Sequence, residues 1–121
     1  MDPRILLVED DPSSSFAIRS FFESRGVVVE HAATVEQAAR LLRLQSYDGV
    51  VTDLSLADDS KVGGLRVAEI AREVQPGSRI VMVTAYASRT LERETRGRGV
   101  RLLRKPVGLE ELAAAVFPPA A

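Results

Sequence analysis

Residues 5–12 read ILLVEDDP. Four apolar residues are followed at once by three acids and a proline, so a buried strand is predicted to pass directly into the start of a helix. Asp11 suits the N-cap of that helix and Pro12 its first position. Three more apolar runs end at polar residues: Gly49–Thr52 is followed by Asp53, Ile80–Val83 by Thr84, and Val100–Leu103 shortly afterwards by Lys105.

Strand-like and helix-like segments alternate along the whole chain. The four runs and a fifth, Val27–Val29, are short and mostly continuous, which is typical of strands buried on both faces. Helical patterns follow them over Pro12 to Gly26, from Thr34 onward, Leu65 to Val74, Ala87 to about Thr95, and Leu109 to Val116. Five such alternations predict an α/β fold: a flavodoxin-like, doubly wound, five-stranded parallel sheet of order 2-1-3-4-5 with five helices.

The composition is that of a soluble globular protein. Of the 121 residues 45% are apolar and 27% are charged, and no apolar run approaches the roughly 20 residues of a membrane span. The start of the chain has no secretory signal pattern and the chain has no cysteine, so a cytoplasmic protein is expected. We expect one domain over residues 1–117 and a short tail over 118–121.

The charge is unevenly distributed along the chain. The net charge is −1, yet the stretch from Arg89 to Lys105 has seven basic residues against two acids, Glu92 and Glu94. This stretch includes the fourth helical pattern, in which Leu91 is almost the only large apolar residue, so that helix is expected to be mobile or partner-dependent. A solvated face is the commonest use of such arginines. Contact with an acidic protein or a nucleic acid is the alternative, although no interleaved aromatic residue supports nucleic-acid stacking.

The residues that follow the strands predict a phosphate-handling metal site. In the 2-1-3-4-5 order the first and third strands are neighbours, so Glu9 and Asp10 should face Asp53. Crowded carboxylates repel one another unless a hard cation such as Mg²⁺ lies between them. Asp53 could then attack phosphorus as a nucleophile, while Lys105 neutralises the phosphoryl oxygens and Thr84 hydrogen-bonds to them.

At these residues the chain resembles the receiver domain of two-component response regulators. The resemblance covers nearly the whole length and is carried by four matching segments: Ile5 to Asp11, Val51-Thr52-Asp53-Leu54, Val83-Thr84-Ala85 and Lys105-Pro106. It implies a phosphoprotein that takes a phosphoryl group from a sensor histidine kinase or a histidine phosphotransfer protein and switches a surface for a downstream effector. Such a module catalyses only its own phosphorylation and dephosphorylation and is otherwise no enzyme.

The resemblance also assigns roles to individual residues. Asp53 would be the phosphoacceptor, Thr84 the switch hydroxyl and Lys105 the salt-bridge partner, followed by a cis bond to Pro106. Asp10 and Asp53 would bind Mg²⁺ directly, Glu9 through water, and Ser55 through its main-chain carbonyl. His31, the only histidine, is assigned no role.

Two departures from the family pattern leave alternatives open. The loop Leu54–Gly63 looks about three residues longer than usual and adds Asp58, Asp59 and Lys61, and Leu102 replaces the usual Tyr or Phe. A degenerate receiver that binds proteins without phosphorylation is therefore the first alternative. An aspartate-nucleophile phosphatase ranks lower, because it would want a second acid at the position of Ser55.

Overall fold

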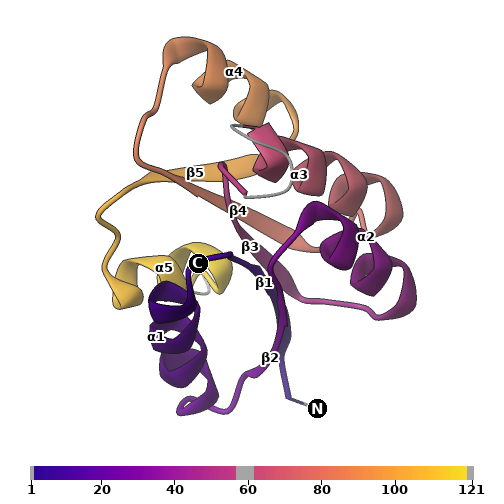
Figure 1. Cartoon of the computed structure of the whole chain (residues 1–121), viewed down its shortest axis with the longest axis vertical. Coiled ribbons are helices and arrows are strands. Elements are labelled where there is room, and N and C mark those ends of the chain that lie inside the picture. Colours follow the sequence, from indigo (N-terminus) through magenta and orange to yellow (C-terminus); the bar gives the residue numbers. More distant parts are fainter. Residues whose placement is uncertain (1, 57–61, 120–121) are drawn as a thin grey trace.

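Strands and helices alternate throughout the computed structural model, which describes residues 2–56 and 62–119 (Figure 1). The strands in this part of the chain are β1 (Arg4–Val8), β2 (Val28–Ala32), β3 (Gly49–Asp53), β4 (Arg79–Thr84) and β5 (Val100–Arg104). The helices are α1 (Pro12–Glu23), α2 (Val35–Leu44), α3 (Gly63–Val74), α4 (Arg89–Gly97) and α5 (Leu109–Val116). The strands pair in parallel in the order β2-β1-β3-β4-β5, which confirms the predicted flavodoxin-like fold. The loop residues Asp58, Asp59 and Lys61 lie outside the described residues.

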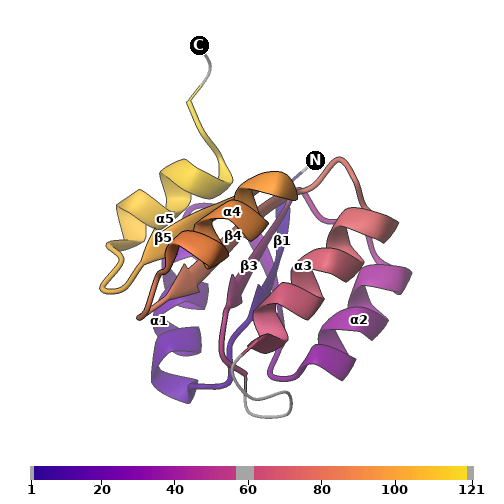
Figure 2. The ribbon, with the colours of Figure 1, turned by 90° about the horizontal axis from the view of Figure 1, so that it is seen from above.

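Helices cover both faces of the sheet, because successive side chains of a strand point to opposite sides. Figure 2 shows α2 and α3 on one side of the sheet and α1 and α5 on the other. The first side has a buried cluster that includes Leu6, Val50 and, from α4, Leu91. The second has a cluster that includes Leu7 and Val51. Burial of each such side chain contributes roughly 1.5–3 kcal/mol, so the two clusters fix the strands that carry the site.

Side-chain caps fix the first turn of α1, where the sequence predicts one, and the first turn of α2. The Asp11 carboxylate accepts a hydrogen bond from the backbone N–H of Ser14 at 2.9 Å. Thr34 Oγ1 accepts one from the N–H of Gln37 at 3.1 Å, and Gln37 Oε1 in turn accepts one from the N–H of Ala33 at 2.8 Å. These bonds satisfy donors that a helix start leaves free.

The structure corrects several predicted boundaries. The first helix ends at Glu23 rather than at Gly26, and Gly26 (φ +81°) terminates the turn that follows. Strand β2 continues to Ala32, because its pairing with β1 persists through polar residues that end the apolar run. Helix α4 begins and ends two residues later than predicted, because Ser88 caps it through a 3.1 Å hydrogen bond from the N–H of Leu91 to Ser88 Oγ.

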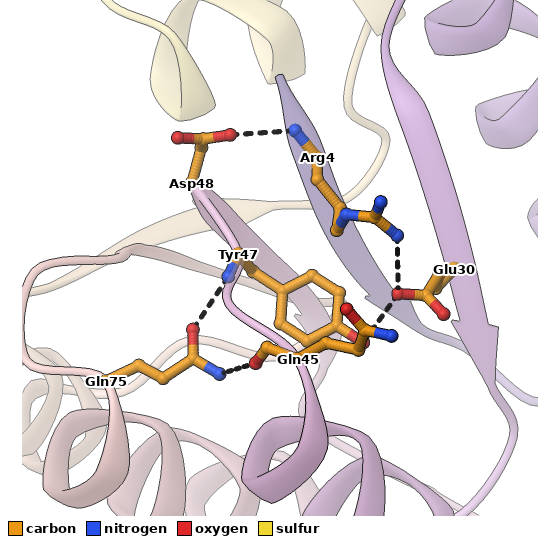
Figure 3. Close-up of polar contacts among 6 residues, drawn as sticks. All are labelled: Arg4, Glu30, Gln45, Tyr47, Asp48 and Gln75. Carbon is orange, nitrogen blue, oxygen red and sulfur yellow. Dashed lines mark hydrogen bonds and ion pairs between the residues drawn. The ribbon is translucent and has the colours of Figure 1, made fainter. Parts of the chain in front are cut away.

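A polar network closes the amino-terminal edge of the sheet, opposite the predicted site (Figure 3). The Arg4 guanidinium pairs with Glu30 at 3.0 Å, and the Tyr47 hydroxyl donates to the same carboxylate at 3.0 Å. The Arg4 N–H donates to Asp48 at 2.8 Å, and the Tyr47 N–H donates to Gln75 at 2.8 Å. Burial and the bond to Glu30 raise the pKa of Tyr47, so its hydroxyl stays protonated. The network joins β1, β2, the α2–β3 connection and the end of α3.

Candidate functional site

The register of the sheet brings the predicted site residues to one edge. Val8 lies beside Thr52 and Asp53 beside Val83. Further across, Thr84 of β4 lies beside Arg104 of β5. The chain therefore leaves β1, β3, β4 and β5 at a common level, and the acids, the threonine and the lysine that follow all lie at the carboxyl edge.

Three carboxylates meet at this edge, as the sequence predicts. Glu9, Asp10 and Asp53 each place a carboxylate oxygen within 4.8 Å of the others. Glu9 is buried, Asp53 is half-buried and Asp10 is exposed. Oxygen ligands of this kind at this spacing suit a hard divalent cation, and Mg²⁺ keeps several waters when only a few carboxylates bind it. The donor set therefore fits the metal that the sequence predicts.

Lys105 neutralises part of this negative charge. Its Nζ lies 3.0 Å from Oδ1 of Asp53, whose side chain is only 11% exposed. Partial burial alone would lower the pKa of Lys105, but the hydrogen bond and the charge of Asp53 outweigh it and raise that pKa. The peptide bond from Lys105 to Pro106 is cis, as the resemblance implies.

The pKa of the Glu9 carboxyl is raised in this site. Burial is the main reason why its pKa rises from the ordinary 4.5 to about 8, and the contact with Asp53 adds to the rise. The N–H of Asp11 donates to Glu9 Oε2 at 3.2 Å and opposes the rise, but does not cancel it. Without a cation, Glu9 thus holds a proton through much of the neutral range.

The raised pKa of Glu9 predicts how stability depends on pH. A carboxyl that holds its proton more tightly when folded contributes stability that is complete below pH 4.5 and is lost as the pH rises through about 8. We therefore expect the metal-free protein to lose thermal stability over this range, and the gain in Tm on adding Mg²⁺ to grow over the same range. Thermal unfolding at pH 5.5 and pH 8, with and without Mg²⁺, measures both changes.

The control for this prediction is Glu9→Gln, which has no carboxyl to titrate. It should flatten the metal-free pH dependence that we attribute to Glu9. An equal Mg²⁺-induced rise in Tm at both pH values in the wild type would contradict the assignment.

Thr84 is the last residue of β4, and Ser55 follows β3, the strand that pairs with β4. Thr84 is buried, and its hydroxyl oxygen accepts a hydrogen bond from the N–H of Tyr86 at 3.1 Å. Ser55 is exposed and lines, together with Thr84 and Tyr86, a cavity of about 590 Å³. The structure thus places both residues beside the strand ends, while the hydroxyl of Thr84 as a switch and the carbonyl of Ser55 as a metal ligand stay predictions.

His31, to which the sequence analysis assigns no role, contacts the backbone of the site. Its Nε2 lies 2.7 Å from the main-chain carbonyl oxygen of Glu9, so the ring can donate a hydrogen bond to the segment that carries Glu9 and Asp10. The N–H of Glu9 also donates to the carbonyl of Ala32 at 3.0 Å. The extension of β2 past its apolar run creates both contacts. The position of His31 near the predicted strand end is the one local hint of them.

Leu102, which stands at the usual aromatic position, is half-buried in β5. It packs against the cluster on the α2–α3 side of the sheet and contributes to the wall between β5 and α4. Its side chain is therefore part of the packing beside α4.

Comparison with known families gives the same interpretation. The response regulator receiver domain model matches residues 5–117. The chain therefore belongs to the response regulator receiver family, whose members work in two-component signalling. It is 31% identical over 117 residues to the photosynthetic apparatus regulatory protein RegA of Rhodovulum sulfidophilum, a match that covers 96% of this chain and 62% of that protein.

Other relatives are longer regulators. RegA of Cereibacter sphaeroides is 34% identical over 87 residues, which are 72% of this chain and 46% of that protein. The alginate biosynthesis transcriptional regulatory protein AlgB of Pseudomonas aeruginosa is 36% identical over 85 residues, 70% of this chain and 18% of that protein. This chain thus matches less than half the length of these two relatives.

Solved structures share the fold closely. A response regulator of Burkholderia pseudomallei, solved with a phosphorylated aspartic acid, a calcium ion and citrate, has a TM-score of 0.85 at 27% identity over 97% of this chain and 68% of that one. The receiver domain of a sensor histidine kinase of Pseudomonas aeruginosa, with a magnesium ion in its active-site cleft, has a TM-score of 0.79 at 28% identity. That match covers 96% of this chain and 95% of that one.

No helix within residues 2–56 and 62–119 has the length and apolar character that a membrane span requires.

Proposed function

We propose that this receiver is a Mg²⁺-dependent phosphorylation switch with Asp53 as the phosphoacceptor. The observation that carries the proposal is the convergence of Glu9, Asp10 and Asp53 within 4.8 Å, with Lys105 at 3.0 Å from Asp53. A carboxylate paired with a lysine and crowded by two further acids is suited to both a metal and a phosphoryl group.

The residues that would hold the metal are Asp10 and Asp53 directly, Glu9 through water, and Ser55 through its carbonyl. Bound Mg²⁺ would neutralise negative charge on the carboxylates and on the incoming phosphoryl group. Because Glu9 is buried, its charge is poorly solvated, and this favours a cation beside it.

The proposed transfer is a displacement at phosphorus. An oxygen of Asp53 forms a bond to the phosphorus of a phosphohistidine, the phosphorus–nitrogen bond breaks, and the imidazole nitrogen keeps the electron pair. Lys105 Nζ, already 3.0 Å from Asp53, would pair with the transferred phosphoryl oxygens, and the Thr84 hydroxyl would move toward them. A cavity of about 600 Å³ between α1 and α5 opens beside Glu9, Asp53 and Lys105 and gives a donor access to the site.

The partners follow from this chemistry. The donor would be a sensor histidine kinase or a histidine phosphotransfer protein in the cytoplasm, and the phosphorylated state would be read by a downstream effector protein. The chain would catalyse only its own phosphorylation and dephosphorylation.

We also propose that residues 1–117 form the receiver domain, followed by a short tail at 118–121. The presence of both the acids and the lysine argues against the degenerate alternative.

The test is phosphorylation of the purified protein by a small-molecule phosphodonor such as acetyl phosphate. Intact-mass measurement should show a phosphoryl adduct with Mg²⁺ and none with a chelator. Asp53→Asn should give no adduct in either condition. A wild-type protein that stays unmodified while keeping its fold and binding Mg²⁺ would contradict the proposal.

A further inference from the structure

His31 reaches from the second strand to the segment that carries two of the three acids. In the register of the sheet, His31 of β2 lies beside Leu7 of β1. Its side chain points to the α1 side of the sheet, as does that of Val29 two residues earlier. From there its Nε2 lies 2.7 Å from the main-chain carbonyl oxygen of Glu9, the residue that follows β1.

The acceptor fixes the direction of this hydrogen bond. A carbonyl oxygen can only accept, so the hydrogen must be on Nε2 of the ring. Within the described residues, no other group donates to the carbonyl oxygen of Glu9. The N–H of Glu9 in turn donates to the carbonyl of Ala32 at 3.0 Å. The peptide groups on both sides of Glu9 are therefore tied to β2.

The second of these peptide groups leads directly into Asp10. The carbonyl of Glu9 and the N–H of Asp10 belong to one planar unit, so a bond to the first orients both. Asp10 is exposed and forms no hydrogen bond or ion pair with another residue of the described ranges. Asp11, by contrast, is held twice, by its N–H on Glu9 Oε2 at 3.2 Å and by the N–H of Ser14 on its carboxylate at 2.9 Å. The bond from His31 is therefore the contact that sets the peptide plane before Asp10.

We propose that His31 is a positioning residue of the metal site, which holds the peptide between Glu9 and Asp10 and so keeps the Asp10 carboxylate where it binds Mg²⁺. The inference rests on the proposed function, because it takes these two acids as residues that hold the metal. Ligands that are ordered before the metal arrives lose less freedom on binding, and partners that orient metal ligands change metal affinity by about 10- to 100-fold. The ring contacts backbone, so it acts through Asp10 and takes no direct part in phosphoryl transfer.

The first test measures the Mg²⁺ affinity of the unphosphorylated protein by titration calorimetry. His31→Leu keeps a side chain of similar size but cannot donate, and should weaken Mg²⁺ binding by about tenfold. His31→Gln brings an amide N–H to the same carbonyl and should restore the affinity to within about threefold of the wild type. The matched control is Val28→Ala, which changes an exposed side chain at the other end of β2 and should alter the affinity less than about twofold.

Two further measurements separate positioning from a general loss of stability. With acetyl phosphate as donor, His31→Leu should raise the Mg²⁺ concentration for the half-maximal rate of adduct formation about tenfold and keep the maximal rate within about twofold of the wild type. In the metal-free protein, the Glu9 amide should exchange with solvent faster in His31→Leu than in the wild type or His31→Gln, as followed by NMR. Thermal unfolding checks that each variant remains folded at the assay temperature.

The role of His31 is overturned if His31→Leu binds Mg²⁺ as tightly as the wild type, or if His31→Gln or Val28→Ala loses as much affinity as His31→Leu. It is also overturned if the loss appears in the maximal rate alone. These outcomes leave the proposed function intact. A wild-type protein that binds no Mg²⁺ would instead overturn the proposed function, and the role of His31 with it.

Discussion

Lys105→Met is expected to slow phosphorylation of Asp53 by about 100-fold while Mg²⁺ binding becomes tighter. Removing one preorganised cationic donor from a phosphoryl-transfer site costs a factor of this order. The ammonium lies 3.0 Å from Asp53 and also interacts with Glu9 and Asp10, so it repels the metal that those carboxylates would bind. The two effects therefore have opposite signs, which a simple loss of folding cannot produce.

The measurements for this variant are the rate of adduct formation by intact mass and the Mg²⁺ affinity by titration calorimetry. The control is Arg79→Gln, which removes an exposed charge at the amino-terminal end of β4, far along the strand from the site. It should change neither quantity by more than about twofold. If Lys105→Met is phosphorylated at the wild-type rate, Lys105 has no part in the phosphoryl transfer.

Gly64→Ala is expected to destabilise the protein by about 2–3 kcal/mol, or roughly 10 °C in Tm. A Cβ on Gly64 would lie 2.7 Å from the Cα of Leu54 and still closer to the main-chain carbonyl of Asp53. These are backbone atoms that cannot move without shifting the end of β3. The N–H of Gly64 also donates to the carbonyl of Leu54 at 2.7 Å, so a shift would disturb that bond as well.

Gly77→Ala is the matched control, because a Cβ there meets no heavy atom within 4 Å. Chemical denaturation of the two variants should show a large loss of stability for the first and a change within about 0.5 kcal/mol for the second. Equal stabilities would contradict the close packing of α3 against the end of β3. Because the clash is with Asp53 itself, Gly64→Ala should also slow phosphorylation.

The fold was predictable because most of its strands are continuous apolar runs in the sequence. Consecutive residues such as Leu6 and Leu7 point to opposite faces of the sheet and are both apolar and buried. Such continuous runs are typical of strands that lie between two layers of helices. The convergence of Glu9 with Asp53 then follows from the parallel topology alone. The structure also confirms the predicted N-cap of the first helix at Asp11.

The features of the structure that the sequence did not predict depend on contacts between distant segments. Strand β2 passes through Glu30 and His31, whose strand conformation is imposed by pairing with β1 rather than by their own polarity. The raised pKa of Glu9 arises from burial that no local pattern encodes. The basic residues of α4 and β5 were visible as a charged stretch, but the groove between them appears only when the helix packs beside the strand.

The central claim is that Asp53, rather than either of its neighbouring acids, receives the phosphoryl group. Borohydride reduces an acyl phosphate to an alcohol, so treating the phosphorylated protein and sequencing its peptides by mass spectrometry locates the modified residue. We predict homoserine at position 53 and unmodified residues at Glu9 and Asp10. Reduction at either of those two acids, with Asp53 intact, would contradict the account.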